Sequence, residues 1–154
     1  MKLQLKRLVP AFALALVGVA AQAGDAPVVT GAWSRATPPG VSVGAAYLVI
    51  TGGDKDDRLT GASSERAEMI ELHEVIEEDG VAKMRSTEGV EIPAGKRVEL
   101  APKGKHLMLM GLDAPLVAGE TYPLVLRFAN SGEQTVTVRV RPATAEAAQP
   151  QPHH

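Results

Sequence analysis

Two histidines and two methionines of this sequence have the types and the spacing of a binding site for a soft metal ion. Ten residues separate His73 from Met84, twenty-one separate Met84 from His106, and Met108 follows two positions later. Uncharged imidazole and thioether groups bind Cu(I) well and bind hard cations poorly. The sequence contains no cysteine, so thiolate sites and a blue-copper centre are excluded. A site made of these side chains would therefore prefer Cu(I), hold it with moderate strength and be open to transfer.

A predicted hairpin brings His73 and Met84 to one face. Asp79-Gly80 is a strong signal for a two-residue turn, because a type I′ turn needs positive φ at both central positions. A turn there places Val75 directly opposite Met84. Side chains alternate along a strand, so His73 and Met84 become diagonal neighbours, with Cα atoms roughly 7–8 Å apart. Charged residues fall on the core-facing side of the second strand, so we expect the hairpin to project beyond the sandwich.

The other two residues of the set lie in the segment His106-Leu107-Met108-Leu109-Met110. In a strand, the histidine and both methionines share one face, and the leucines lie on the other. If this strand lies near the hairpin, two imidazoles and two thioethers converge. The alternatives for each residue are ordinary ones, because methionine commonly fills cores and a lone histidine is commonly solvated.

Other histidines and methionines are candidates for secondary roles. Met110 shares the face of His106, and packing beside the site is favoured over ligation. Met69 has the right parity but sits four residues from His73, roughly 13 Å along a strand, so core or edge packing is favoured. The adjacent His153 and His154 suit weak capture of a second ion, Cu(II), and a solvated tail is the alternative.

The elements that must position these side chains are all β-strands. Short apolar or alternating runs recur every eight to twelve residues with turn residues between them, a pattern typical of a sandwich or barrel. No window shows the apolar periodicity of a helix. We expect nine strands, at Val28–Ala36, Val43–Thr51, Arg58–Ala62, Met69–Ile76, Val81–Arg85, Arg97–Leu100, His106–Leu112, Tyr122–Phe128 and Thr135–Val140.

Residues 1–23 have the pattern of a secretory signal peptide. A basic start precedes the apolar run Leu8–Ala20, and Ala21-Gln22-Ala23 supplies the small residues that signal peptidase requires. The apolar run is too short for a stable membrane span, and no second one follows. We therefore expect a periplasmic protein without a membrane anchor after cleavage. A retained membrane helix is the alternative.

The rest of the chain divides into a copper-binding β domain, residues 24–142, and a flexible Ala/Pro/Gln tail, residues 143–154, that ends in His-His. Cleavage removes three basic residues, which takes the formal net charge from −2 to −5. An acidic domain without a basic stripe argues against a nucleic-acid partner. No motif of a catalytic triad or a phosphate-binding loop is present, so we do not expect an enzyme.

The ligand spacing and its flanking sequence resemble those of the periplasmic PCu(A)C copper chaperones. The resemblance spans Val28 to Val140 and includes a four-ligand pattern, which is far more specific than an isolated His-x-Met. The blocks that carry it are Ala32–Gly40, Gly44–Tyr47, Glu71–Glu74, Ile92–Gly95 and His106–Leu112.

The resemblance implies a cupredoxin-like Greek-key β-sandwich or barrel with one Cu(I) at a solvent-accessible site. It also implies a role in supplying copper to the binuclear copper centre of a haem–copper (cytochrome c) oxidase. We expect a monomer whose partner is a copper-accepting oxidase subunit or another periplasmic copper chaperone. Two alternatives remain: a periplasmic copper-buffering or resistance protein using the same site, and a metal-free β-sandwich interaction module. An electron-transfer role is disfavoured, because the cysteine of blue-copper sites is missing.

Overall fold

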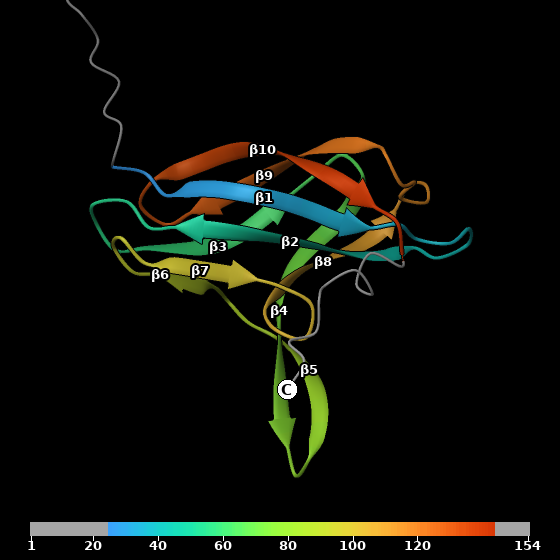
Figure 1. Ribbon diagram of the computed structural model, residues 1–154, viewed down its shortest axis with the longest axis horizontal. Coiled ribbons are helices and arrows are strands. Elements are labelled where there is room, and N and C mark those ends of the chain that lie inside the picture. The colour runs from blue at the N-terminus through green and yellow to red at the C-terminus, as the bar shows by residue number, and fades with distance from the viewer. Residues whose placement is uncertain (1–24, 144–154) are drawn as a thin grey trace, which may run out of the picture.

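The computed structural model of the protein describes residues 25–143, which form ten β-strands and no helix (Figure 1). No segment among them is a helix with the length and hydropathy of a membrane span. The predicted signal peptide and the tail after residue 143, with its two histidines, lie outside the described residues. The strands are β1 (Val28–Arg35), β2 (Val43–Thr51), β3 (Asp57–Ser63), β4 (Ala67–Glu78), β5 (Val81–Ser86), β6 (Val90–Ile92), β7 (Arg97–Leu100), β8 (His106–Leu112), β9 (Thr121–Phe128) and β10 (Gly132–Arg141).

The all-β prediction is confirmed, and nine of the ten strands lie where the sequence predicts them. The tenth, β6, has only three residues between Gly89 and Pro93. Such a short run cannot display an alternating pattern, so nothing in the local sequence distinguishes it from a loop.

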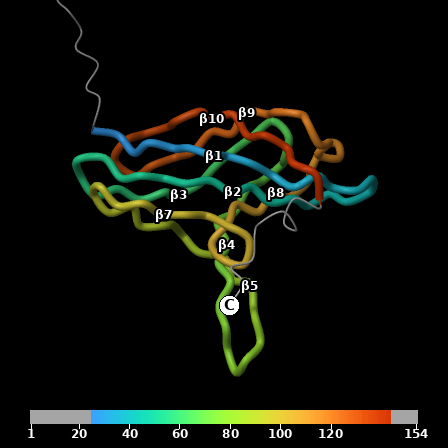
Figure 2. Tube along the Cα trace, viewed as in Figure 1, coloured from blue at the N-terminus to red at the C-terminus, as the bar shows by residue number. Residues whose placement is uncertain are grey.

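The strands form one continuous sheet in the order β5-β4-β8-β2-β1-β10-β9-β3-β6, and β7 pairs with β2 outside this path. One edge of β2 pairs first with β8, through residues 43–46, and then with β7, through residues 48–51. Its other edge pairs with β1, which joins β10 in parallel. The trace in Figure 2 shows the sheet folding over on itself, so that strands distant in sequence enclose one core.

Aliphatic side chains fill this core. The leucines of β2 and β9 and two leucines of β8, Leu107 and Leu109, are buried, and valine, isoleucine, tyrosine and phenylalanine residues belong to the same cluster. Each such side chain contributes about 1.5–3 kcal/mol by leaving water. None of the four methionines in residues 25–143 belongs to the cluster. The core therefore does not account for the presence of methionine in this domain.

Asp57 is the buried carboxylate of the body of the domain, with an exposed fraction of 5%. It accepts hydrogen bonds from the backbone N–H groups of Asn130 (2.9 Å) and Ser131 (3.0 Å), and from the Ser131 hydroxyl. Burial raises the pKa of Asp57, but the Ser131 hydroxyl and the backbone donors together outweigh it, so the pKa lies below its ordinary value. The charged carboxylate thus fastens the β9–β10 turn to the start of β3.

The hairpin of β4 and β5 projects from the body of the domain, as the sequence predicts (Figure 1). The first half of β4, up to His73, pairs with β8, whereas its second half pairs only with β5. Every residue of β5 is exposed. The hairpin therefore leaves the sheet at His73, and its outer half depends on its own cross-strand pairs.

Candidate metal centre

Strands β4 and β8 place the two histidines directly opposite each other. The antiparallel register pairs His73 with His106 and Glu71 with Met108. Residues opposite each other in such a pair point to the same side of the sheet, with Cβ atoms about 4.5–5.5 Å apart. The two imidazole rings accordingly lie with centroids 5.8 Å apart. A pairing between strands more than thirty residues apart in sequence thus joins the two halves of the predicted ligand set.

The β4–β5 hairpin brings Met84 to the same face. Asp79 and Gly80 form its two-residue turn with φ values of 54° and 74°, as a type I′ turn requires. The resulting register pairs Val75 with Met84. Met84 is therefore a diagonal neighbour of His73, and this predicted arrangement is confirmed.

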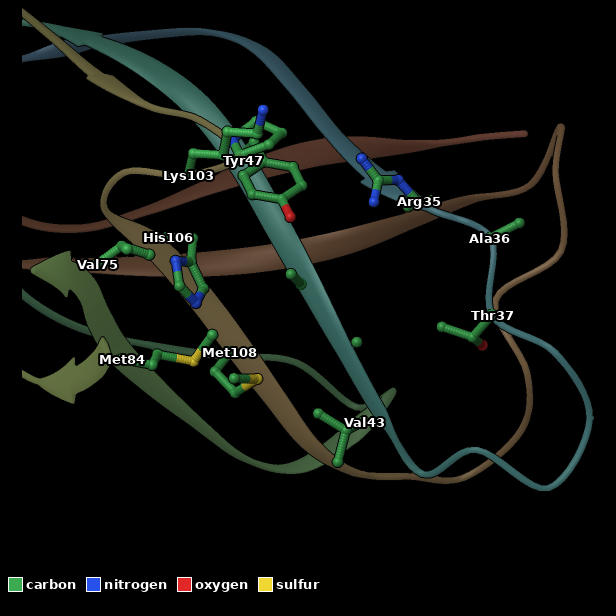
Figure 3. A pocket seen from close by; sticks show the side chains of 13 residues that line it. Arg35, Ala36, Thr37, Val43, Tyr47, Val75, Met84, Lys103, His106 and Met108 are labelled. Carbon is green, nitrogen blue, oxygen red and sulfur yellow. The ribbon is translucent and has the colours of Figure 1, made fainter. Parts of the chain in front are cut away.

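A hollow of about 500 Å³ opens beside these residues, with Met84, His106 and Met108 in its wall. Figure 3 shows Met84, His106 and Met108 next to one another, with the thioether of Met84 reaching toward the other two side chains. Side chains of β1 and β2 line the opposite wall, among them Arg35 and Tyr47. Three of the four predicted residues thus line an open depression on the outer face of the sheet, and His73 lies next to it through its contact with the His106 ring.

Each histidine has one ring nitrogen engaged and the other available. In His106, Nδ1–H donates to the Gly104 carbonyl oxygen at 3.0 Å, which leaves the lone pair of Nε2 for a metal. In His73, Nε2–H donates to the Glu71 carboxylate at 2.9 Å. The remaining nitrogen, Nδ1 of His73, is buried and has no hydrogen-bond partner. A buried polar atom without a partner is costly, so this nitrogen needs an acceptor of its lone pair, which a metal ion would provide.

The burial of the four side chains is graded. His106 has an exposed fraction of 5%, and Met84 is 56% exposed. His73 and Met108 are of intermediate burial. One side of the site is therefore fixed in the sheet, whereas the opposite side is open to solvent.

Aromatic side chains pack beside His106. Tyr47 lies between Trp33 and His106, with ring centroids 4.7 Å and 6.4 Å away. The guanidinium of Arg141 stacks over Trp33 at 4.7 Å. Large rings with few rotamers restrict how far the His106 imidazole can turn. This packing assigns Trp33, the one tryptophan of the chain, to the edge of the site rather than to the core.

Comparison with known proteins establishes the family. Residues 28–140 match the family model described as "LpqE-like: Putative lipoprotein LpqE-like". The chain belongs to the LpqE-like family. It is 36% identical over 118 residues to "Putative lipoprotein Lxx21020" of Leifsonia xyli, which covers 76% of this chain and 70% of that protein. It is 29% identical over 95 residues to "Uncharacterized protein RP573" of Rickettsia prowazekii, covering 61% of this chain and 52% of that one.

Solved structures of similar fold extend this comparison. The solution structure of CuI-DR1885 from Deinococcus radiodurans has a TM-score of 0.63 at 33% identity, covering 80% of this chain and 83% of that one. The copper-bound PCuAC domain from PmoF2 has a TM-score of 0.66, covering 78% and 96%. Its identity to the present LpqE-like protein is 23%, so it bears on the fold alone. The resemblance to the PCu(A)C proteins and the cupredoxin-like β fold are confirmed.

Two supporting groups in this LpqE-like site are not predicted by the ligand spacing. Glu71 orients His73, and its position two residues earlier on the same strand face is a signal that alternation provides. The Gly104 carbonyl in the preceding loop orients His106. This contact depends on the path of the backbone and not on a side chain, so no residue type in the sequence indicates it. Carboxylates and carbonyls of this kind commonly fix the tautomer of a metal-binding histidine.

Of the two placements expected for Met69, the core or an edge of the sheet, the structure excludes the core. Its side chain is 52% exposed and points to the outer face, directly opposite Met110. All four methionines of residues 25–143 therefore lie on the same side of the sheet as the two histidines. In that part of the chain, no three His, Asp or Glu side chains gather in a way that could hold a metal. The donor set available is thus a soft one, rich in sulfur.

Proposed function

We propose that this LpqE-like protein is a copper carrier that binds one Cu(I) through His73, Met84, His106 and Met108. The observation that carries the proposal is the geometry of the two imidazoles. Each has one nitrogen held by a protein acceptor and the other free, the two rings are 5.8 Å apart, and His106 shares one hollow with the thioethers of Met84 and Met108. Two neutral nitrogens and two neutral sulfurs form a donor set that prefers Cu(I) to Zn(II) or hard cations.

The relatives support this assignment. The structure of CuI-DR1885 is that of a Cu(I) form of a protein 33% identical to this chain. Two observations of the present chain favour transfer over permanent retention of the ion. No thiolate is present to hold it strongly, and Met84 is more than half exposed. An acceptor can therefore approach the ion from the open side and replace the donors one at a time.

We place the protein in the periplasm, after removal of residues 1–23, with a haem–copper oxidase as the recipient. The sequence pattern of the first residues supports export, as does the description of the family and of one relative as lipoproteins. The PCu(A)C resemblance supports this recipient, and the acceptor is then the binuclear copper centre of the oxidase or another copper chaperone. No catalytic step is part of this function.

The site is tested by titrating the protein with Cu(I) against a chelator of known affinity, followed by X-ray absorption of the loaded form. We expect the first equivalent to bind with moderate affinity, with nitrogen and sulfur neighbours in equal number. Substitution of both histidines, His73→Phe and His106→Phe, removes the nitrogen signal and lowers affinity by at least tenfold. Unchanged binding in this double variant would contradict the proposed ligands.

Delivery is tested separately from binding. The Cu(I)-loaded protein is mixed with the copper-free soluble domain of an oxidase subunit, and the metal in each is measured after separation. We expect most of the copper to move to the acceptor. Copper that stays on the carrier in the presence of an empty acceptor would support buffering or resistance instead.

A further inference from the structure

A second cluster of sulfur lies next to the proposed site and has no part in it. Met69 of β4 and Met110 of β8 are direct partners in the antiparallel register. On its other edge, Met110 is paired with Val43 of β2. Met69 is 52% exposed, Met110 is partly exposed, and neither belongs to the hydrophobic core. Core packing thus explains neither side chain.

Methionine is also a poor choice for an exposed strand position on structural grounds alone. Strands favour β-branched and aromatic residues, and a solvated face is usually polar. Here two flexible thioethers face each other from neighbouring strands, on the face that holds both histidines. What methionine offers at such a position is a soft, uncharged and mobile sulfur atom.

The geometry of the pair suits a monovalent soft ion. Directly opposite residues of an antiparallel pair have Cβ atoms about 4.5–5.5 Å apart, so two unbranched side chains can close on one ion in ordinary rotamers. Cu(I) accepts two-coordinate geometry with neutral sulfur, whereas Zn(II) and Ca(II) require more or harder donors. The pair is therefore selective by its chemistry, and weaker than a four-donor site.

We propose that Met69 and Met110 form a second Cu(I) site, a two-sulfur site one step along the sheet from the main one. Met108 precedes Met110 by two residues on the same face, a distance of about 7 Å along the strand. The carboxylate of Glu71 lies between Met69 and His73 on the shared face of β4, where its negative charge favours a cation. An ion held at Met69 and Met110 is thus close to Met108, the nearest sulfur ligand of the main site.

The test follows each sulfur separately in the full chain. The protein is labelled with ¹³C in the methionine methyl groups and titrated anaerobically with Cu(I) to three equivalents. We expect the Met84 and Met108 methyl signals to shift during the first equivalent. The Met69 and Met110 signals shift together afterwards, with a dissociation constant at least tenfold weaker. His153 and His154 carry no methionine methyl, so an ion bound at the tail produces no such shift.

Two outcomes would overturn this proposal. One is that the Met69 and Met110 signals stay in place up to three equivalents. The other is that they shift in step with Met84, which would make them part of a single site. Failure of the main site has a different signature, because the Met84 and Met108 signals would then stay in place.

The double variant Met69→Leu/Met110→Leu provides the matched control. Leucine is close to methionine in volume, so the domain stays folded, which thermal unfolding followed by circular dichroism checks. We expect this variant to lose the weaker binding step and to keep the first equivalent with an affinity within twofold of the parent protein. A variant that retains the weaker step in full would contradict the proposed site.

Discussion

The two faces of the β4–β8 pair are built from the same strands and serve opposite purposes. Leu107 and Leu109 of β8 point inward and are completely buried. Their neighbours on the strand, the histidine and methionines of β8, point outward to the hollow and to solvent. The buried leucines of the inner face stabilise the fold. The fold in turn holds the imidazole and thioether groups of the outer face in position. Stability and metal binding can therefore be changed separately.

The largest expected effect is on the inner face. Leu109→Ala removes a fully buried side chain and leaves a cavity, so we expect a loss of about 2–5 kcal/mol in the free energy of unfolding. Chemical denaturation measures this loss. The Cu(I) affinity of the protein that remains folded should stay within twofold, and a large loss of affinity would show that the two faces are coupled.

The matched change on the outer face is Met108→Leu, one position away. We expect Cu(I) affinity to fall about a hundredfold, equivalent to about 2.7 kcal/mol, because a donor sulfur is replaced by carbon. The free energy of unfolding should change by less than about 1.5 kcal/mol, since the two side chains are similar in volume. Chelator competition and denaturation of the metal-free protein measure the two quantities. Equal affinities of variant and parent would exclude Met108 as a ligand.

Asp57 makes the free energy of unfolding of the domain depend on pH, and so allows stability to be changed without touching the outer face. Its pKa is lower in the folded protein than in the unfolded chain, so its contribution is present above about pH 4 and is lost as pH falls through the folded pKa. We expect Asp57→Asn to cost about 1–3 kcal/mol at neutral pH, because the turn donors lose a charged acceptor. Denaturation at a series of pH values should show the two proteins converging in acid. A constant difference would assign the cost to packing instead.

The smallest expected effect concerns the orientation of His73. Glu71→Ala removes the acceptor of its Nε2–H, and we expect Cu(I) affinity to fall about tenfold with little change in stability. Glu74→Ala is the control, since Glu74 lies on the opposite face of β4, across from Arg85 in the strand register. Equal effects of the two substitutions would point to net charge rather than to orientation of the ring.

Much of this architecture follows from local sequence signals. The turn at Asp79-Gly80 determines the hairpin register, and alternation then determines which side chains share a face with His73. The association of β4 with β8 does not follow from such signals, because it joins segments far apart in the chain through core packing. The exposure of Met69 could not be predicted either, since alternation gives the face of a residue but not which face is buried.

The point at which the hairpin leaves the sheet has a mechanical consequence. Three of the four proposed donors stand where β4 and β8 are joined by backbone hydrogen bonds, and the fourth, Met84, stands on the free arm beyond His73. Bending of that arm would withdraw one sulfur and leave the other three donors in place, without disturbing any buried side chain. A docking protein that displaces the hairpin would thereby remove one ligand from the ion and weaken its binding.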